Sequence, residues 1–293
     1  MLGWLDANLV TLVDGVAFGV LLFTIALGLS LVFGVLDVLN LAHGAIYLVG
    51  SYLAVQLLGG GGTAMGLFLL AAVLALLVGA AGGAALALLT SPLKSRGHLD
   101  QALLTLGVAL VVVDLLSARF GNDVRAVDPP AALTGSASLL GHDYPVYRLA
   151  LVAAGLLLAL GAYLLVERTR FGSLVRATVV DAPMVRALGV DTGRLTAVVF
   201  AGGAGLAALG GVLGAPLLSA FPGLDERVLI LGLVVIVVGG LGSVAGALVG
   251  ALVIGQVQVL GVALLPSYAS FLLFGAMAAV LLLRPAGLVG SRA

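Results

Sequence analysis

The sequence contains no cysteine, and only one of its 293 residues, Lys94, is a lysine. The absence of cysteine excludes disulfide bonds and thiolate metal sites. No glycine occurs among residues 88–93, just before that lysine, so the chain has no GxxxxGK[ST] loop to hold nucleotide phosphates. HExxH and GxSxG are also missing. We therefore expect a protein that is not an enzyme and that binds no metal or cofactor, so that any ATP used would be hydrolysed by another polypeptide.

Charge is scarce as well. Only 9% of the residues are charged and 62% are hydrophobic, whereas a soluble domain is nearer a quarter charged and half apolar. Apolar runs long enough to cross a bilayer, roughly 20 residues for a helix, recur from end to end. The first run follows a segment without Lys or Arg, unlike a cleavable signal. We expect one all-α domain over residues 1–293, a polytopic integral membrane helical bundle of about eight to nine segments.

The expected membrane segments are residues 11–34, 36–58, 64–90, 100–118, 148–166, 195–219, 228–241, 242–262 and 267–283. Two junctions between them, 34–40 and 239–243, are interrupted by glycine. Such breaks are tolerated at membrane depth only where protein buries them or where they line a cavity. The second predicts Gly-broken helices or a hairpin within 228–262, which either spans or re-enters. Because the two breaks occupy comparable places in halves of opposite direction, they indicate an inverted repeat with a solute path at its interface.

Basic residues are distributed unevenly between alternate loops. One set of loops holds nine of them: Lys94, Arg96, Arg168, Arg170, Arg176, Arg186, Arg194, Arg284 and Arg292. The other set holds four: Arg119, Arg125, Arg148 and Arg227. Since cytoplasmic loops carry the excess of Lys and Arg, we expect residues 167–194 and the C-terminus in the cytoplasm and the N-terminus outside.

Residues 167–194 form a polar island with five arginines. Within it, Asp181 is a suitable N-cap and Gly189 sits where a left-handed residue ends a helix, so a short helix is expected over about 182–188. Met184 and Leu188 would share one face, with Arg186 on another. Two interpretations remain open, insertion of the apolar side chains into a groove on a cytoplasmic partner and contact of a basic loop with lipid headgroups.

Polar residues follow the first break. Asp37, Asn40 and His43 fall within the membrane, where ionisable groups are costly and face protein or water. Asn40 and His43 would line the solute path, or would hydrogen-bond the broken helix and hold its bend. The residues alone do not decide between these roles.

Three stretches carry a family resemblance. FGVLDVLNLAHGAIYLVGSYLA (residues 33–54) resembles the signature of the high-affinity branched-chain amino acid ABC importer permeases, and of their H-type subunit in particular. The loop at 168–200 is similar to the family's cytoplasmic segment that contacts the ATPase, and VVIVVGGLGSVAGALVGALVIG (234–255) resembles its C-terminal Gly-rich hairpin. The likeness covers essentially the whole chain in order and spacing.

The resemblance implies a permease subunit in a prokaryotic cytoplasmic membrane. Its partners would be a second, identical or related permease subunit, two cytoplasmic ATP-binding subunits, an extracytoplasmic solute-binding protein and membrane lipid, with no nucleic acid. The residues implied to couple to the ATPase are Asp181, Ala182, Met184, Arg186, Leu188 and Gly189. Those expected along the substrate pathway are Asn40, His43, Gly44, Tyr47, Gly240, Gly242 and Ser243. Ala45 departs from the acidic residue that family members often carry there.

We therefore expect import of branched-chain or related neutral amino acids by alternating access. Urea and short-amide permeases share these motifs, so such a cargo remains an alternative. An ion-coupled secondary transporter built on an inverted repeat is a second alternative, although it would need an ion site that Asp37 and Asp114 only weakly suggest.

Overall fold

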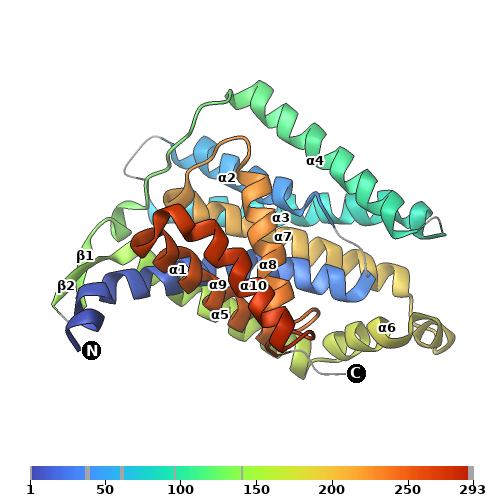
Figure 1. The fold of residues 1–293 in the computed structure, drawn as a ribbon. Helices are drawn as coiled ribbons and strands as arrows, with labels where there is room; N and C mark the ends of the chain where they lie inside the picture. The colour runs from blue at the N-terminus through green and yellow to red at the C-terminus, as the bar shows by residue number, and fades with distance from the viewer. Residues whose placement is uncertain (1, 37–39, 60–62, 96, 140, 290–293) are drawn as a thin grey trace.

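The computed structural model describes residues 2–36, 40–59, 63–95, 97–139 and 141–289. Nearly all of the ordered elements are helices (Figure 1). The helices are α1 (Leu2–Leu36), α2 (His43–Leu58), α3 (Met65–Thr90), α4 (His98–Phe120), α5 (Val146–Arg168), α6 (Arg170–Ala187), α7 (Thr192–Leu218), α8 (Leu224–Gly239), α9 (Val244–Leu264) and α10 (Ala269–Leu283). Short 3-10 turns occur at Ser91–Ser95, Ala131–Leu133 and Pro266–Tyr268.

Two short strands interrupt the helical pattern between α4 and α5. β1 (Ser136–Leu139) and β2 (His142–Pro145) form an antiparallel hairpin in which Ala137 lies opposite Tyr144. These residues fall between the expected membrane segments 100–118 and 148–166, and the expected all-α domain included no strand. The hairpin leaves the fold class unchanged, because the described core consists of helices.

Seven helices in the described part of the chain are long and apolar enough to cross a membrane, which confirms the polytopic bundle. Two further apolar helices, α2 and α8, have only 16 residues each. The segment expected at 36–58 is thus a helix that begins only at His43, while Asp37 lies outside the described residues. The pair expected at 228–262 is a helical hairpin, α8 and α9, joined by the turn at 240–243.

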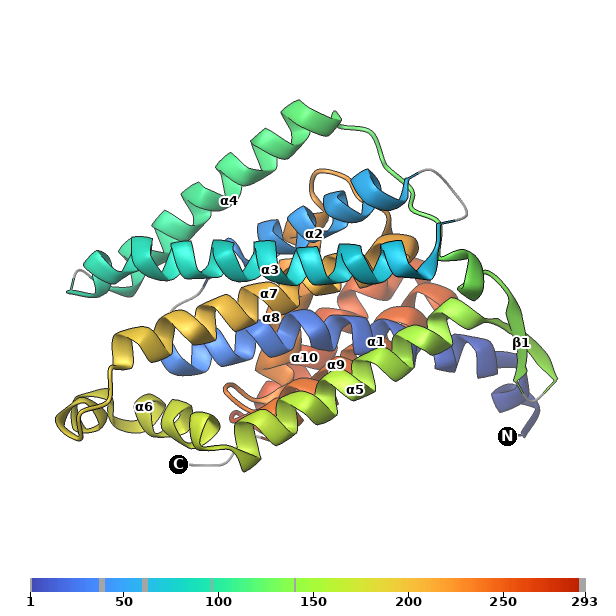
Figure 2. The ribbon, with the colours of Figure 1, turned by 180° about the vertical axis from the view of Figure 1, so that it is seen from behind.

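The helices form two sets of four, α1–α4 and α7–α10, that make corresponding contacts. α3 lies along α7, and in the same way α9 lies along α1. The short helix α2 contacts α3, α4 and α7, while the short helix α8 contacts α9, α10 and α1. α1 and α7 run in opposite directions at the centre (Figure 2). This reciprocal packing of α1–α4 and α7–α10 is the arrangement that the predicted inverted repeat requires.

Small residues allow the two sets to approach closely. A Cβ added to Gly50 of α2 would lie 1.9 Å from the carbonyl oxygen of Ala208 in α7, and one added to Gly83 of α3 would lie 2.4 Å from that of Phe200. In lipid there is little hydrophobic drive between helices, so van der Waals contact between closely approaching backbones holds them together. The glycine content therefore contributes directly to the packing of this bundle.

The bundle has two distinct ends (Figure 2). The α6 end carries α6, the turn between α3 and α4, and the C-terminus, whereas the hairpin end carries the N-terminus and β1–β2. At the hairpin end, Arg125 and Ala220 exchange two backbone hydrogen bonds of 2.8 Å, which join the loop after α4 to the loop after α7. The segments that the sequence analysis assigned to the cytoplasmic side, namely the turn after α3, the α6 segment and the chain after α10, thus lie at one end.

Candidate functional site

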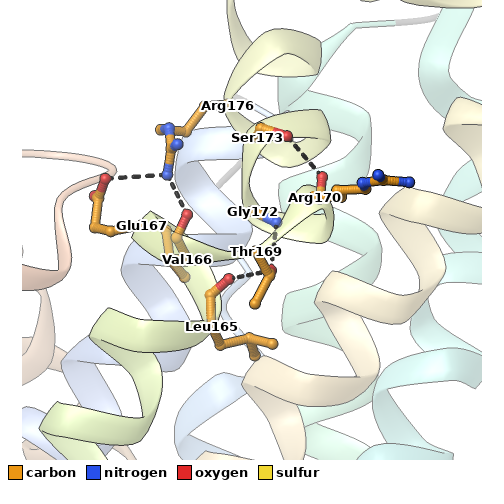
Figure 3. A network of polar contacts seen from close by, with 8 residues as sticks. All are labelled: Leu165, Val166, Glu167, Thr169, Arg170, Gly172, Ser173 and Arg176. Atoms are coloured by element: carbon orange, nitrogen blue, oxygen red, sulfur yellow. Dashed lines mark hydrogen bonds and ion pairs between the residues drawn. The ribbon is translucent and has the colours of Figure 1, made fainter.

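A tight turn at residues 165–176, called the elbow below, connects α5 to the α6 segment (Figure 3). The hydroxyl of Thr169 accepts a 3.2 Å hydrogen bond from the amide of Gly172 and so caps α6. Arg176 donates to the carbonyl of Val166 and lies 3.1 Å from the carboxylate of Glu167. A Cβ on Gly172 would lie 1.9 Å from the Val166 carbonyl oxygen, so the turn of α6 over α5 requires glycine there.

The second part of α6 is the short helix that the sequence predicts. At Asp181 the backbone leaves the helical region (φ −153°, ψ 86°), and its carboxylate accepts a 2.9 Å hydrogen bond from the amide of Met184. Gly189 has a φ of +85° and donates to the carbonyl of Arg186 at 2.9 Å, while Val190 donates to that of Val185 at 3.3 Å. This pair of bonds is a Schellman motif. Both predicted helix boundaries are confirmed.

Residues 170–180 form a helix that the sequence analysis left as part of a polar loop. The Thr169 cap starts this helix, and the side chains of Val175 and Thr178 are buried, which gives it a face against the bundle. These contacts stabilise a segment that is too short and too polar to be recognised as a helix from its sequence.

The short helix at 182–187 presents apolar side chains away from the bundle. Met184 is 56% exposed and Leu188 is 72% exposed, whereas Val185 between them is buried. Arg186 is exposed on the same helix, as is Ala182 to a lesser degree. Val180, 86% exposed just before the kink, adds an apolar side chain that the sequence analysis did not select. The surface therefore combines exposed apolar groups with arginine.

Asn40 and His43 are fully buried at the start of α2. The side-chain oxygen of Asn40 accepts a 3.1 Å hydrogen bond from the amide of Ala42. The Nε2 of His43 lies 3.1 Å from the carbonyl oxygen of Ile25, and since a carbonyl only accepts, this nitrogen carries the proton. Asn40 Nδ2 and His43 Nδ1 have no partner among the described residues. Both residues thus hold the start of α2 and retain unused hydrogen-bonding capacity.

Gly44 and Tyr47 pack α2 against α7 and α8. A Cβ on Gly44 would lie 2.3 Å from the carbonyl oxygen of Asp225 in α8. The hydroxyl of Tyr47 lies against Gly214, where a Cβ would come within 2.1 Å of it. Ala45, between them, is buried with 1% exposure. The side chain that departs from the family's frequent acid thus lies inside the packed core.

Gly240, Gly242 and Ser243 form the turn between α8 and α9. Gly240 and Gly242 have φ values of +107° and +72°, which favour glycine. The amide of Gly242 donates to the hydroxyl of Ser30 at 3.1 Å, and the Ser243 hydroxyl accepts from Gly246 at 3.0 Å and caps α9. All three turn residues line a cavity of about 520 Å³ that the chain after α10 also borders.

The two groups of expected pathway residues lie at opposite ends of α8. Gly44 contacts the first turn of α8, whereas Gly240 follows its last turn. Fifteen helical residues separate Asp225 from Gly240, which corresponds to about 22 Å. The structure therefore does not bring Gly44 and Gly240 into one pocket, because α8 holds them apart.

Asp225 is a buried charged residue that the sequence analysis missed. It is only 8% exposed, and its carboxylate accepts a 3.1 Å hydrogen bond from the amide of Gly223. No ion pair of Asp225 occurs within the described ranges. The expected segment began at residue 228, so residues 225–227 counted as loop. An acid at the start of an apolar run was the available signal.

One large cleft of the described structure is apolar. It has a volume of about 650 Å³, lies between α3 and α5 over α1 and α7, and is lined mainly by leucine and alanine. A smaller cavity of about 530 Å³ at the hairpin end is lined in part by Arg119 and Arg125. The guanidinium of Arg119 lies 5.2 Å from the ring centre of Phe120 there.

Comparison with known proteins identifies relatives over nearly the whole chain. Residues 11–281 match the family described as "Branched-chain amino acid transport system / permease component". The chain is 29% identical to the high-affinity branched-chain amino acid transport system permease protein BraD of Pseudomonas aeruginosa, over 95% of this chain and 94% of that protein. It is 28% identical to the corresponding permease LivH of Escherichia coli, over 94% of each. A probable LivH of Methanocaldococcus jannaschii is 29% identical over 92% of this chain and 89% of its own. No solved structure matches.

Proposed function

Because the chain belongs to the family of permease components of branched-chain amino acid transport systems, we propose that it is the membrane permease of an ATP-driven importer for branched-chain or related neutral amino acids. The observation that carries this proposal is the match over residues 11–281 together with relatives that align along nearly their full length. Seven helices of the described residues are long and apolar enough to cross a membrane, which agrees with such a role. The chain itself binds no cofactor in this proposal, and separate subunits hydrolyse ATP.

The proposed coupling surface is residues 180–189 of the α6 segment. Exposed Val180, Met184 and Leu188 would enter a groove on an ATP-binding subunit, with Arg186 at the rim. Asp181 and Gly189 would act indirectly, because they fix the two ends of the short helix. We assign the α6 end to the cytoplasm on the distribution of Lys and Arg.

A movement of this surface would be transmitted to the bundle through α5 and α7. The elbow at Thr169 and Arg176 ties α6 to α5. A short connection joins α6 to α7. Asp191 caps α7, because its carboxylate accepts a 3.0 Å hydrogen bond from the backbone amide of Arg194. α7 in turn contacts α1, α2 and α3, so a displacement of α6 would move the centre of the inverted repeat. In this proposal, alternating access follows from that displacement.

The remaining partners and the pathway residues are assigned from their positions relative to the α6 end and the hairpin end of the bundle. The hairpin end, including the loops around Arg119 and Arg125, would face the solute-binding protein outside, and a second permease subunit would complete the pathway. Asn40, His43, Gly44 and Tyr47 would lie along the pathway at the start of α2. Gly240, Gly242 and Ser243 would line its cytoplasmic part, since Gly242 bonds Ser30 in the last two turns of α1.

Co-purification from native membranes tests the proposal. Wild-type chain in mild detergent should bring down an ATP-binding subunit, and Arg186→Glu combined with Leu188→Asp should lose it. Arg186→Lys combined with Leu188→Met is the matched control and should retain it. A folded wild-type chain that brings down no ATPase would overturn the assignment. Uptake that persists without ATP but stops with an uncoupler would instead support the secondary transporter.

A further inference from the structure

The two short helices of the inverted repeat meet at their N-termini. Gly44, in the first turn of α2, lies against the carbonyl of Asp225, in the first turn of α8. Each helix has 16 residues, which gives a length of about 24 Å, less than the roughly 30 Å hydrocarbon core of a bilayer. Both helices that meet here are therefore too short to cross the hydrocarbon core.

This junction lies within the depth of the membrane. α8 ends at the turn that bonds Ser30, near the α6 end of the span Asn8–Phe33. Asp225 is about 21 Å or less from that end of α8, which is short of the hydrocarbon thickness. His43, at the start of α2, bonds the carbonyl of Ile25 inside the same α1 span. Both N-termini are thus remote from the two membrane surfaces.

Asp225 places a buried carboxyl group in the first turn of α8. Its side chain is buried and accepts a hydrogen bond from Gly223, but it forms no ion pair with any described residue. A buried carboxylate without a partner is strongly unfavourable. The next residues, Glu226 and Arg227, are exposed on the surface of the chain. Charged groups exposed at this depth must face water or another subunit rather than lipid.

The N-terminus of α2 supplies hydrogen-bond donors and partial positive charge. Gly44 and Ala45 lie in the first turn of α2, where a backbone amide has no acceptor within its own helix, and helix N-termini attract anions through such N–H groups. Asn40, 1% exposed, already bonds this N-terminus through its oxygen and has an unpartnered Nδ2. His43 Nδ1 is likewise without a described partner. Because Gly44 touches the backbone of Asp225, these donors and this acid belong to the first turns of two helices in contact.

We propose that this α2–α8 junction binds the charged groups of a free α-amino acid as it passes through the permease. The carboxylate of the amino acid accepts from the N-terminal amides of α2 and from Asn40, and its ammonium group pairs with Asp225. The proposal rests on the proposed import of amino acids and makes it more specific. An uncharged cargo such as urea or a short amide would leave Asp225 unpaired, so the junction selects zwitterions.

The absence of cysteine in the chain permits a direct test. Glu226→Cys, in the complete transporter in proteoliposomes without binding protein, places one thiol of this chain beside Asp225. A charged methanethiosulfonate reagent should modify it, and saturating leucine should slow the modification. Leucinamide, which lacks the carboxylate, and 4-methylpentanoate, which lacks the ammonium group, should not protect. A thiol that never reacts would show that Glu226 does not face water, and this would overturn the proposal.

Asp225→Asn in the Glu226→Cys background should raise the half-protecting leucine concentration about 30-fold, as expected when one partner of a buried charge pair is removed. Asp123→Asn, an exposed carboxylate at the hairpin end, is the matched control and should leave protection unchanged. Equal protection in both variants would overturn the site. Co-purification of the ATPase and leucine uptake by the same preparations report separately on the proposed function.

Discussion

Gly28 of α1 and Gly203 of α7 lie against each other at the centre of the inverted repeat. A Cβ on Gly28 would come within 2.3 Å of the carbonyl oxygen of Gly203, and one on Gly203 within 2.8 Å of that of Gly28. The contact is reciprocal, as expected for equivalent helices of two related halves. It brings the two longest central helices to backbone contact, and the short helices α2 and α8 pack around them.

Gly28→Ala should destabilise the bundle. The added methyl group meets backbone rather than a movable side chain, so α1 and α7 must separate, at a cost of about 1–3 kcal/mol. The midpoint of thermal unfolding in detergent should fall. Gly107→Ala in α4, where a Cβ meets nothing within 4 Å, is the control and should leave the midpoint unchanged or slightly higher. Equal midpoints for the two variants would refute the central packing role of Gly28.

At the hairpin end, the phenol of Tyr144 donates a 2.7 Å hydrogen bond to Asp14, which also pairs with Arg148. Burial and the nearby carboxylate raise the pKa of Tyr144 above its usual value. A raised pKa means that the stabilisation is complete below the unfolded value of about 10 and is lost only as pH rises through the folded value. Tyr144→Phe should therefore cost about 1–3 kcal/mol, equally at pH near 6 and near 9.

Chemical unfolding of the wild type and of Tyr144→Phe at both pH values checks this. A difference in the free energy of unfolding that disappears by about pH 9 would mean that the phenol ionises below its ordinary value of about 10, which contradicts a raised pKa. Tyr163→Phe, a more exposed tyrosine of α5, serves as control and should change little at either pH.

Arg176→Met should affect coupling more than stability. The side chain bridges the Val166 carbonyl and Glu167 at the elbow, but both charged partners are more than 40% exposed. Such ion pairs contribute about 0–1 kcal/mol to stability. We expect an assembled complex with a nearly unchanged unfolding midpoint, in which ATP hydrolysis continues while leucine uptake per ATP falls. Uptake per ATP, measured in proteoliposomes, is the readout.

Arg170→Met provides the matched control for that change. Figure 3 shows the Arg170 side chain pointing away from Arg176 and Glu167, so its loss leaves the elbow intact. Unaltered coupling in both variants would show that the elbow does not transmit motion.

Gly189→Ala should weaken attachment of the ATP-binding subunit. The residue has a φ of +85° at the end of the 182–187 helix, a conformation that costs a residue with a Cβ about 1–2 kcal/mol. The helix end would fray and the exposed Leu188 would shift. We expect several-fold less ATPase in the co-purified complex. Gly161→Ala in α5, where a Cβ meets nothing within 4 Å, should bind as well as the wild type.

The features that could be predicted were those with a local cause. Asp181 and Gly189 act on the backbone within a few residues of themselves, so their positions sufficed to predict both ends of the short helix. The helix at 170–180 could not be predicted in this way, since it depends on the elbow with Val166 and on burial of Val175 against the bundle. Asp225 was overlooked for a similar reason, because only the contact with Gly44 shows that the start of α8 lies inside the protein.

The sequence by itself determined that this chain is a helical membrane protein, which family it belongs to and where its long apolar helices lie. The apolar composition shows that lipid surrounds much of the chain. A long apolar run in lipid forms a helix, because its backbone groups must hydrogen-bond to one another. Tertiary structure decided which helices meet and how close they come. Gly44 and Gly240, both expected along one pathway, lie at opposite ends of α8, which is about 22 Å long between Asp225 and Gly240. Gly44 and Asp225, which are 181 positions apart, are neighbours because both short helices start inside the inverted repeat.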